Sequence, residues 1–349
     1  MGPVAKRMAL AVALSAVALS AGVADAADNG FYAGKQIELL SGSEPPGVYD
    51  AYVRLLAKYM PKYIPGQPTI VVQYMPGAGG IKVTNYIANI APRDGTVFAG
   101  TIAGAPTAAL MTPDVAKFDI NKLSWIGSAA RDPYIGYVWH SSKIQTLEDA
   151  KKMPSTMGGT SAGTAGVDMV ILADAFFGFK FKLVAGYQTS ADVKLAMEKG
   201  ELDGTFANAW SDLKTLNYDW VRDGKVRIIV QHGFAKDPAL PGDAPLFIDQ
   251  AKTDADRQAL YLMLARQEAS KPFFASPDLP PGRLDILRHA FDAAIKDPGF
   301  VQDATAAHLS VDGAMTGDEL AQMVTKLSAT PTTVVERVKT TLANYHGDK

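Results

Sequence analysis

Short apolar runs rich in β-branched and aromatic residues alternate along the chain with longer segments in which apolar residues recur at helical spacing. Such runs predict buried strands. They lie at residues 36–40, 69–72, 96–101, 124–130, 134–139, 182–187, 202–208, 226–231 and 271–276. Between them, spacings such as that of Val83, Ile87 and Ile90 predict amphipathic helices. This alternation predicts an α/β fold, with sheets that are mainly parallel and flanked by helices.

The turn at residues 75–80, Met-Pro-Gly-Ala-Gly-Gly, lies between a predicted strand and a predicted helix. Its glycines allow positive φ and carry no side chain that would keep a ligand away. The free N–H groups of the following helix, with the positive end of the helix dipole, favour an anion at this position. The turn is therefore either an anion-binding site or a tight connection in which glycine only allows close packing.

Small-residue turns recur at residues 41–50, 102–106 and 157–166, each between a strand and a helix. In a parallel sheet such turns gather at the carboxyl edge, where ligands bind. The backbones expected to contact ligand are those of Gly47, Val48, Tyr49, Ala78, Gly79, Gly80, Ala103, Gly104, Ser161, Ala162, Gly163 and Thr164. The side chains expected to discriminate among ligands are those of Tyr49, Ser161, Thr164 and Asn208.

Four polar residues near these turns, Asn208 among them, have two possible roles each. Asp50 either caps the following helix or shapes a ligand-contacting loop. Tyr187 and Asn208 end predicted strands, where they contact ligand or make ordinary loop hydrogen bonds. Arg131 is a candidate ligand contact, or it pairs with Asp132 or another carboxylate.

The length of the chain, 349 residues, predicts about two domains. Residues 131–133 form the passage into the second domain, and the strand at 226–231 leads back to the first. We therefore expect a first lobe of residues 27–130 and 233–349 and a second lobe of residues 131–232. Near the C-terminus, Thr316 and Glu319 have the spacing of a capping box before a helix.

Residues 1–26 have the pattern of a secretory signal peptide. Lys6 and Arg7 precede an apolar stretch at residues 8–21, and Ala24-Asp25-Ala26 fits a cleavage site. We predict cleavage after Ala26 and export. The chain contains no cysteine, which excludes disulfides and a lipid-modified cysteine.

The net charge of −2 and the 20% of charged residues describe an ordinary globular protein. Nucleic-acid binders normally carry a basic stripe, so no nucleic-acid partner is expected. The five histidines are scattered without metal-ligand spacing, and neither a metal nor a cofactor is predicted. We expect a monomer.

Together, these motifs resemble the periplasmic receptors of tripartite tricarboxylate transporters, the Bug family. The resemblance spans nearly all of the predicted mature chain. It rests on Gly47 with Asp50, on residues 76–80, 92–96 and 161–166, on Tyr187 with residues 200–203, and on residues 280–282. It implies a two-lobed, type II Venus-flytrap fold with two interdomain crossings. It also implies a carboxylate ligand, held by loop amides and ordered water in the periplasm and delivered to a two-subunit membrane permease.

The first loop departs from the family pattern. The family carries a run like Gly-Gly-Gly-Thr-Asp there, whereas this chain keeps only Gly47 and Asp50 around Val48 and Tyr49. Glu44 adds a negative charge near the same loop. The class of carboxylate therefore does not follow from the resemblance.

Two other functions share some of these features. Residues 159–163 fit the G-x-S-x-G pattern of a serine hydrolase, with Ser161 as nucleophile. Its acid would be Asp203 or Asp249 and its base His232, His289 or His308, although no motif marks these residues as catalytic. A periplasmic receptor that signals to a membrane sensor without transport would share every feature named above.

Overall fold

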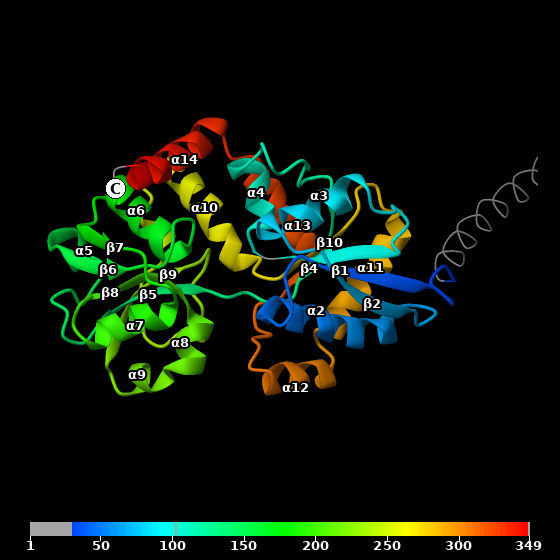
Figure 1. Cartoon of the computed structure of the whole chain (residues 1–349), viewed down its shortest axis with the longest axis horizontal. Coiled ribbons are helices and arrows are strands. Elements are labelled where there is room, and N and C mark those ends of the chain that lie inside the picture. The colour runs from blue at the N-terminus through cyan, green and yellow to red at the C-terminus, as the bar shows by residue number, and fades with distance from the viewer. Residues whose placement is uncertain (1–29, 102, 348–349) are drawn as a thin grey trace, which may run out of the picture.

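The computed structural model describes residues 30–101 and 103–347, which form two lobes side by side (Figure 1). The predicted signal peptide and its cleavage site after Ala26 lie outside the described residues. Each lobe is built around one sheet. The strand orders are β11-β4-β10-β3-β1-β2 and β7-β6-β8-β5-β9. The two-lobed α/β architecture predicted from the sequence is confirmed.

The first sheet contains both parallel and antiparallel pairs. β1 pairs in parallel with β2 and β3, β10 pairs antiparallel with β3 and β4, and β11 pairs antiparallel with β4. Its strands are β1 (Gln36–Ser41), β2 (Thr69–Tyr74), β3 (Val97–Gly100), β4 (Ser124–Ser128), β10 (Pro272–Ala275) and β11 (Met315–Thr316).

The second sheet is mixed in the same way. β6 pairs in parallel with β7 and β8, and β5 pairs antiparallel with β8 and β9. Its strands are β5 (Tyr134–Trp139), β6 (Ser155–Gly158), β7 (Phe181–Val184), β8 (Gly204–Ala209) and β9 (Val226–His232).

Four strands of each sheet run in one direction, as expected, but β10 and β11 in the first sheet and β5 in the second run the opposite way, so both sheets are mixed. The chain passes from the first sheet to the second between β4 and β5, and it returns between β9 and β10. β5 and β10 are each the first strand after such a crossing. The parallel strands of each sheet end at the junction of the lobes, whereas β5 and β10 begin there. β5 and β10 must therefore run opposite to the parallel strands of their own sheets.

Helices surround both sheets, and their positions follow the predicted periodicity. The capping box at Thr316 and Glu319 is present at the start of α13, as predicted. The α-helices are α2 (Val48–Tyr59), α3 (Ile81–Asn89), α4 (Ala105–Met111), α5 (Asp149–Lys152), α6 (Ala165–Phe177), α7 (Ser190–Glu198), α8 (Trp210–Leu216), α9 (Tyr218–Arg222), α10 (Asp254–Glu268), α11 (Pro281–Ala294), α12 (Pro298–Ala306), α13 (Gly317–Ser328) and α14 (Thr332–Gly347). Short 3₁₀ segments lie at η1 (Met60–Tyr63), η2 (Ala78–Gly80) and η3 (Phe247–Gln250). Within the described ranges, no helix is both long and apolar enough to span a membrane.

Two helices link the lobes. α14 packs against α6 of the second lobe and against α10 and α4, and α10 also packs against α4 (Figure 1). At the crossings, the Arg131 Nε lies 3.2 Å from Glu268 Oε2, and the Asp132 amide donates to the Gln267 carbonyl at 3.1 Å. The role predicted for Arg131 as a partner of another carboxylate is confirmed, and that pair joins the segment between β4 and β5 to the end of α10.

Candidate ligand-binding site

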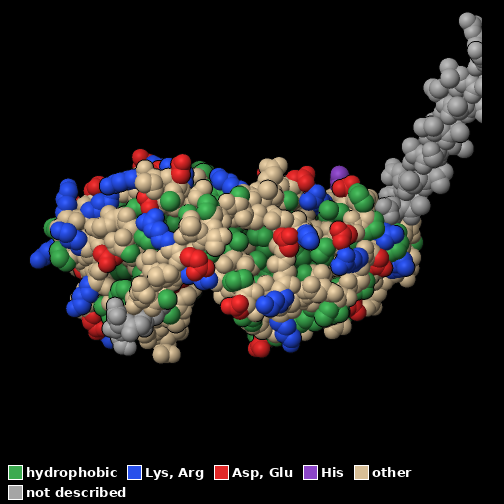
Figure 2. Space-filling view, turned by 90° about the horizontal axis from the view of Figure 1, so that it is seen from above, with side chains coloured by type: hydrophobic (Ala, Val, Ile, Leu, Met, Phe, Trp, Pro, Cys, Tyr) green, Lys and Arg blue, Asp and Glu red, His purple; other side chains and the backbone are tan. Residues whose placement is uncertain are grey.

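A cavity of about 750 Å³ lies between the lobes. In the space-filling view of Figure 2, a notch separates the lobes along one edge. The walls of the cavity come from α2, η2, α3 and α4 of the first lobe, from β5, the 162–164 loop and α6 of the second, and from α10 and α14. The lining residues are Tyr49, Ala78, Gly79, Ile81, Ala103, Gly104, Thr107, Ala108, Met111, Thr112, Tyr134, Ala162, Gly163, Thr164, Ala165, Asp168, Met169, Leu262, Met263, Arg266, Gln267, Leu342 and Ala343.

The glycine turn at residues 77–80 has the conformation that its sequence predicts. Gly77, Gly79 and Gly80 have φ values of 141°, 61° and 86°, and Ala78 joins them at 47°. α3 begins at Ile81 with no acidic residue in its first turn. The turn thus brings backbone atoms to the cavity wall, next to a helix end that has no carboxylate of its own.

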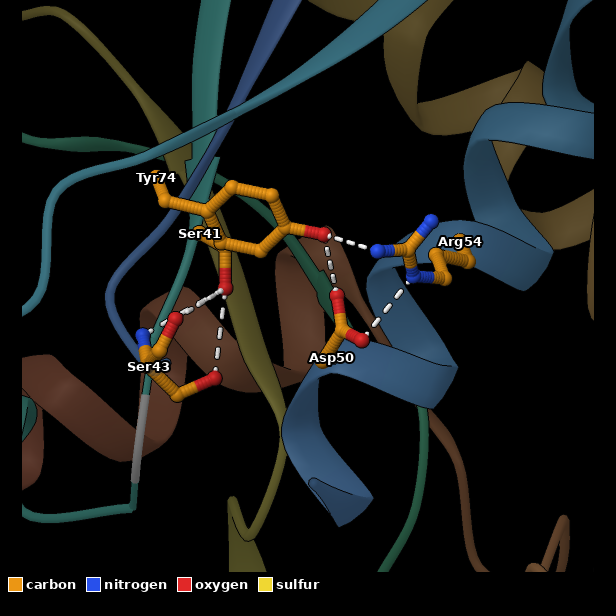
Figure 3. Close-up of polar contacts among 5 residues, drawn as sticks. All are labelled: Ser41, Ser43, Asp50, Arg54 and Tyr74. Atoms are coloured by element: carbon orange, nitrogen blue, oxygen red, sulfur yellow. Dashed lines mark hydrogen bonds and ion pairs between the residues drawn. The ribbon is translucent and has the colours of Figure 1, made fainter. Parts of the chain in front are cut away.

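The entrance of α2 is fixed by a three-residue network (Figure 3). Asp50 does not cap the helix; Gly47 is the N-cap residue and makes no side-chain cap bond. The Asp50 carboxylate instead accepts from Arg54 Nε at 2.9 Å and from the Tyr74 hydroxyl at 2.6 Å. Burial and the Asp50 carboxylate raise the pKa of Tyr74, consistent with a protonated hydroxyl that donates. The network ties the first turn of α2, which carries Tyr49, to the end of β2.

Tyr49 reaches the cavity from α2 and contacts the start of α4. Its hydroxyl accepts from the Ala103 amide at 3.4 Å, and its ring faces the Lys271 ammonium at 4.7 Å from the ring centroid. Burial raises the pKa of Tyr49, so its hydroxyl remains a donor at neutral pH. Burial lowers the pKa of Lys271, and the charge of Asp132 counteracts this shift. The Asp132 carboxylate also accepts from the Ser211 hydroxyl at 2.9 Å.

The second-lobe loop at residues 161–164 differs from the expected anion site in one respect. The Gly163 amide donates to Asp168 Oδ1 at 3.0 Å, within the first turn of α6. The Thr164 hydroxyl donates to the Ser161 carbonyl at 2.7 Å. Asp168 therefore already places a carboxylate at the positive end of α6. A second anion there would face this like charge.

Arg266 of α10 reaches the same loop from the opposite wall. Its Nη1 donates to the Gly163 carbonyl at 3.3 Å. Its positive charge also acts on the Tyr49 and Tyr134 hydroxyls, lowering pKa values that burial raises. The lining of the cavity thus includes a guanidinium and two tyrosines, a combination suited to a carboxylate.

Three solved structures have a fold similar to that of this chain. A TctC solute-binding protein from Polaromonas, without ligand, matches with a TM-score of 0.70 and 16% identity, covering 88% of this chain and 99% of that one. The fold of this chain is therefore similar to that of a TctC solute-binding protein. The periplasmic binding protein BugD matches with a TM-score of 0.53 and 18% identity, covering 89% and 98%. An R. palustris protein with adipate matches with a TM-score of 0.55 and 17% identity, also covering 89% and 98%. No protein-family model matches the chain, and no curated protein matches its sequence.

Within this TctC-type fold, eight of the residues predicted from the sequence line the cavity together. They are Tyr49, Ala78, Gly79, Ala103, Gly104, Ala162, Gly163 and Thr164. Seven others do not line it: Gly47, Val48, Asp50, Gly80, Ser161, Tyr187 and Asn208. Val48 is an exposed residue at the start of α2, and Gly80 follows the lining pair at the start of α3. Tyr187 lies beyond the end of β7.

Asn208 lines a smaller neighbouring cavity of about 160 Å³ in the second lobe, which shares Tyr134, Thr164 and Ala165 with the larger one. Its side-chain amide donates to the Tyr137 hydroxyl at 3.2 Å and to Asp212 Oδ2 at 2.9 Å. Both amide hydrogens thus have partners within the protein, and the alternative role in local hydrogen bonding is observed.

The arrangement needed for a serine hydrolase is not assembled around Ser161. In the part of the chain that the structure describes, its hydroxyl has no hydrogen-bond partner. His232 is fully buried and donates from Nε2 to the Phe206 carbonyl at 2.6 Å. A nucleophilic serine needs a base within hydrogen-bond reach. The described residues also contain no cluster of side chains that could hold a metal ion.

The predictions from sequence missed Arg266 and the apolar wall formed by Met111, Met263 and Leu342. Arg266 lies in α10, which no sequence motif connected with the site. One signal was present: an arginine in the run Leu260-Tyr-Leu-Met-Leu-Ala-Arg266, otherwise without charge.

Proposed function

We propose that this chain is an exported receptor that captures a small organic carboxylate between its two lobes. The observation that carries this proposal is a cavity whose walls come from both lobes of a TctC-type fold. A ligand in such a cavity contacts both lobes only when they approach each other, and its binding therefore favours a closed state. The proposal includes no catalytic role for Ser161.

A carboxylate is the ligand that the polar end of the cavity favours. Arg266, Tyr49 and Tyr134 supply donors, and the neighbour named with adipate has a related fold. Micromolar affinity needs about −8 kcal/mol. Hydrogen bonds to a charged group contribute about 1.5–3 kcal/mol each. Three such bonds, together with apolar contacts, can therefore supply a binding free energy of the size that micromolar affinity needs.

The remaining parts of the proposal concern the protein in the cell. We propose that the first 26 residues direct export to the periplasm and are cleaved after Ala26, and that the mature protein is a monomer without a cofactor. We propose lobe boundaries at 130/131 and 232/233, with α14 bridging both lobes, and delivery of the ligand to a tripartite tricarboxylate-type permease. Mass spectrometry of the exported protein tests the cleavage site, and uptake measurements with and without the permease test delivery.

Thermal unfolding against a panel of organic acids tests the receptor function. Ligand at a hundred times its dissociation constant stabilises a protein by about 2.7 kcal/mol. The midpoint should rise by several degrees, since about 2–4 °C per kcal/mol is the upper range for a protein of this size. The protein should first be unfolded and refolded to remove co-purified ligand. A stripped protein whose midpoint does not respond to any acid in the panel would contradict the proposal.

A further inference from the structure

The charged side chains around the cavity are few. Among the described residues that line it, Arg266 is the one basic side chain and Asp168 the one acidic side chain. Asp168 accepts from the Gly163 amide within its own lobe. The cavity therefore offers one cation to an anionic ligand.

The polar end of the cavity lies where α10 ends and α4 begins. Arg266 is in the last turn of α10, and the Ala103 amide just before α4 donates to the Tyr49 hydroxyl at 3.4 Å. Asp132 also lies near these tyrosines; burial raises its pKa, the charge of Lys271 opposes that shift, and its carboxylate accepts from the Ser211 hydroxyl. Arg266 is the basic side chain that a ligand can contact at this end, among the described residues that line the cavity.

The apolar end lies further along the same two helices. Leu262 and Met263 precede Arg266 by about one turn of α10, or about 5 Å along the axis. Met111 ends α4, about 10 Å from its start. α4 and α10 pack against each other, and Leu342 of α14 adds to this wall. Both helices therefore contribute apolar side chains to the lining next to the polar group of Arg266.

We propose that the cavity selects a monocarboxylate with an apolar body, whose carboxylate pairs with Arg266 and whose body lies against Met111, Met263 and Leu342. This inference rests on the proposed function and narrows its ligand class. A second carboxylate at the far end of the ligand would lose water against apolar side chains with no cation to replace it, which is costly.

The size of the cavity agrees with such a ligand. A volume of about 750 Å³ lies in the range of sites that enclose drug-sized molecules. Methionine side chains adapt to different apolar shapes, and Met111, Met169 and Met263 all line the cavity.

Isothermal titration of three eight-carbon probes into the stripped full chain tests the inference. Octanoate has one carboxylate, octanedioate has one at each end, and octanamide has the same length without charge. We expect octanoate to bind at least tenfold more tightly than either of the others. Octanedioate binding equally or more tightly would overturn the monocarboxylate inference, and so would octanamide binding as tightly as octanoate.

Two variants probe the two ends of the cavity separately. Arg266→Gln should weaken octanoate binding by about ten- to a hundredfold, the equivalent of one hydrogen bond to a charged group. Arg257→Gln, at an exposed position of the same helix outside the cavity, is the matched control and should leave it unchanged. Met111→Lys places a cation at the apolar end and should shift the preference towards octanedioate. An unchanged preference in a folded Met111→Lys protein would overturn the proposed orientation.

The same measurements separate the two proposals. A stripped protein that binds octanedioate or another diacid, but not octanoate, is still a carboxylate receptor, and only the narrower inference fails. A stripped protein that binds none of the organic acids contradicts the proposed function itself.

Discussion

His232 is a fully buried imidazole in the second lobe, and its surroundings suit only the neutral form. Nε2 donates to the Phe206 carbonyl, while Nδ1 has no hydrogen-bond partner within the described ranges. The ring lies among the side chains of Phe206 and Phe247. Burial lowers the pKa of His232 from 6.5 to about 4.

This lowered pKa predicts a loss of stability in acid. Below pH 6.5 the unfolded chain takes up a proton at this histidine, whereas the folded chain does not until about pH 4. The contribution of His232 to stability is therefore complete above pH 6.5 and falls by about 3 kcal/mol as the pH drops to 4. Urea unfolding of wild type and His232→Gln at several pH values measures this difference.

We expect the free energy of unfolding of His232→Gln to fall less between pH 6.5 and 4.5 than that of the wild type. The exposed His140 supplies the control, because its replacement by Gln removes an imidazole from the surface and leaves the buried one in place. Parallel slopes for wild type and His232→Gln would show that the buried imidazole does not control acid stability.

At the scale of single elements, the junction of α2 and β2 depends on the Asp50, Arg54 and Tyr74 network (Figure 3). Asp50 is almost fully buried, and the Tyr74 hydroxyl also accepts from Arg54 Nη2 at 2.5 Å. Tyr74→Phe removes this hydroxyl and leaves the carboxylate with one partner fewer. We expect a loss of about 1–2 kcal/mol in the free energy of unfolding, measured by denaturant titration.

A tyrosine without such a contact provides the comparison. Tyr218 is 52% exposed and its hydroxyl has no hydrogen-bond partner among the described residues. Tyr218→Phe should change stability by less than about 0.5 kcal/mol. If both variants behave alike, the network does not stabilise the entrance of α2.

The elements also show what local sequence could predict. The turn at residues 77–80 was predictable because glycines, a preceding strand and a following helix are adjacent in the chain. The engagement of the Gly163 amide by Asp168 was not, since the same pattern fits a free anion site. Local pattern specifies where a loop lies and which backbone angles it needs. It does not specify which donors remain free.

At the scale of the whole molecule, the site depends on contacts between distant segments. Arg266 and Tyr49 lie more than 200 residues apart in the chain and come together only because α10 returns across the lobes. The direction of β5 and β10 likewise follows from the two crossings, which no local periodicity encodes. Fold class was predictable from alternating elements, whereas the cation and the apolar wall required the assembled lobes.

Ligand binding at Arg266 is expected to bring the two lobes together. The Gln267 carbonyl accepts from the Asp132 amide at a crossing, and the adjacent Arg266 lines the cavity. A carboxylate held at Arg266 therefore acts next to the segment about which the lobes would move. The walls of the cavity belong to both lobes, so ligand contacts increase as the lobes approach each other.

Spin labels can measure this motion because the chain has no cysteine of its own. Val48 and Leu216 are both exposed, at one end each of α2 and α8, which lie in different lobes (Figure 1). In the Val48→Cys, Leu216→Cys protein we expect octanoate to shorten the distance between the labels by more than about 2 Å. A Val48→Cys, Val301→Cys protein, labelled within the first lobe, should show no change. If octanoate binds and the label distances stay the same in both proteins, then the ligand enters the cavity without closure of the lobes. The choice between ligands would then depend only on the lining residues in the conformation that the structure shows.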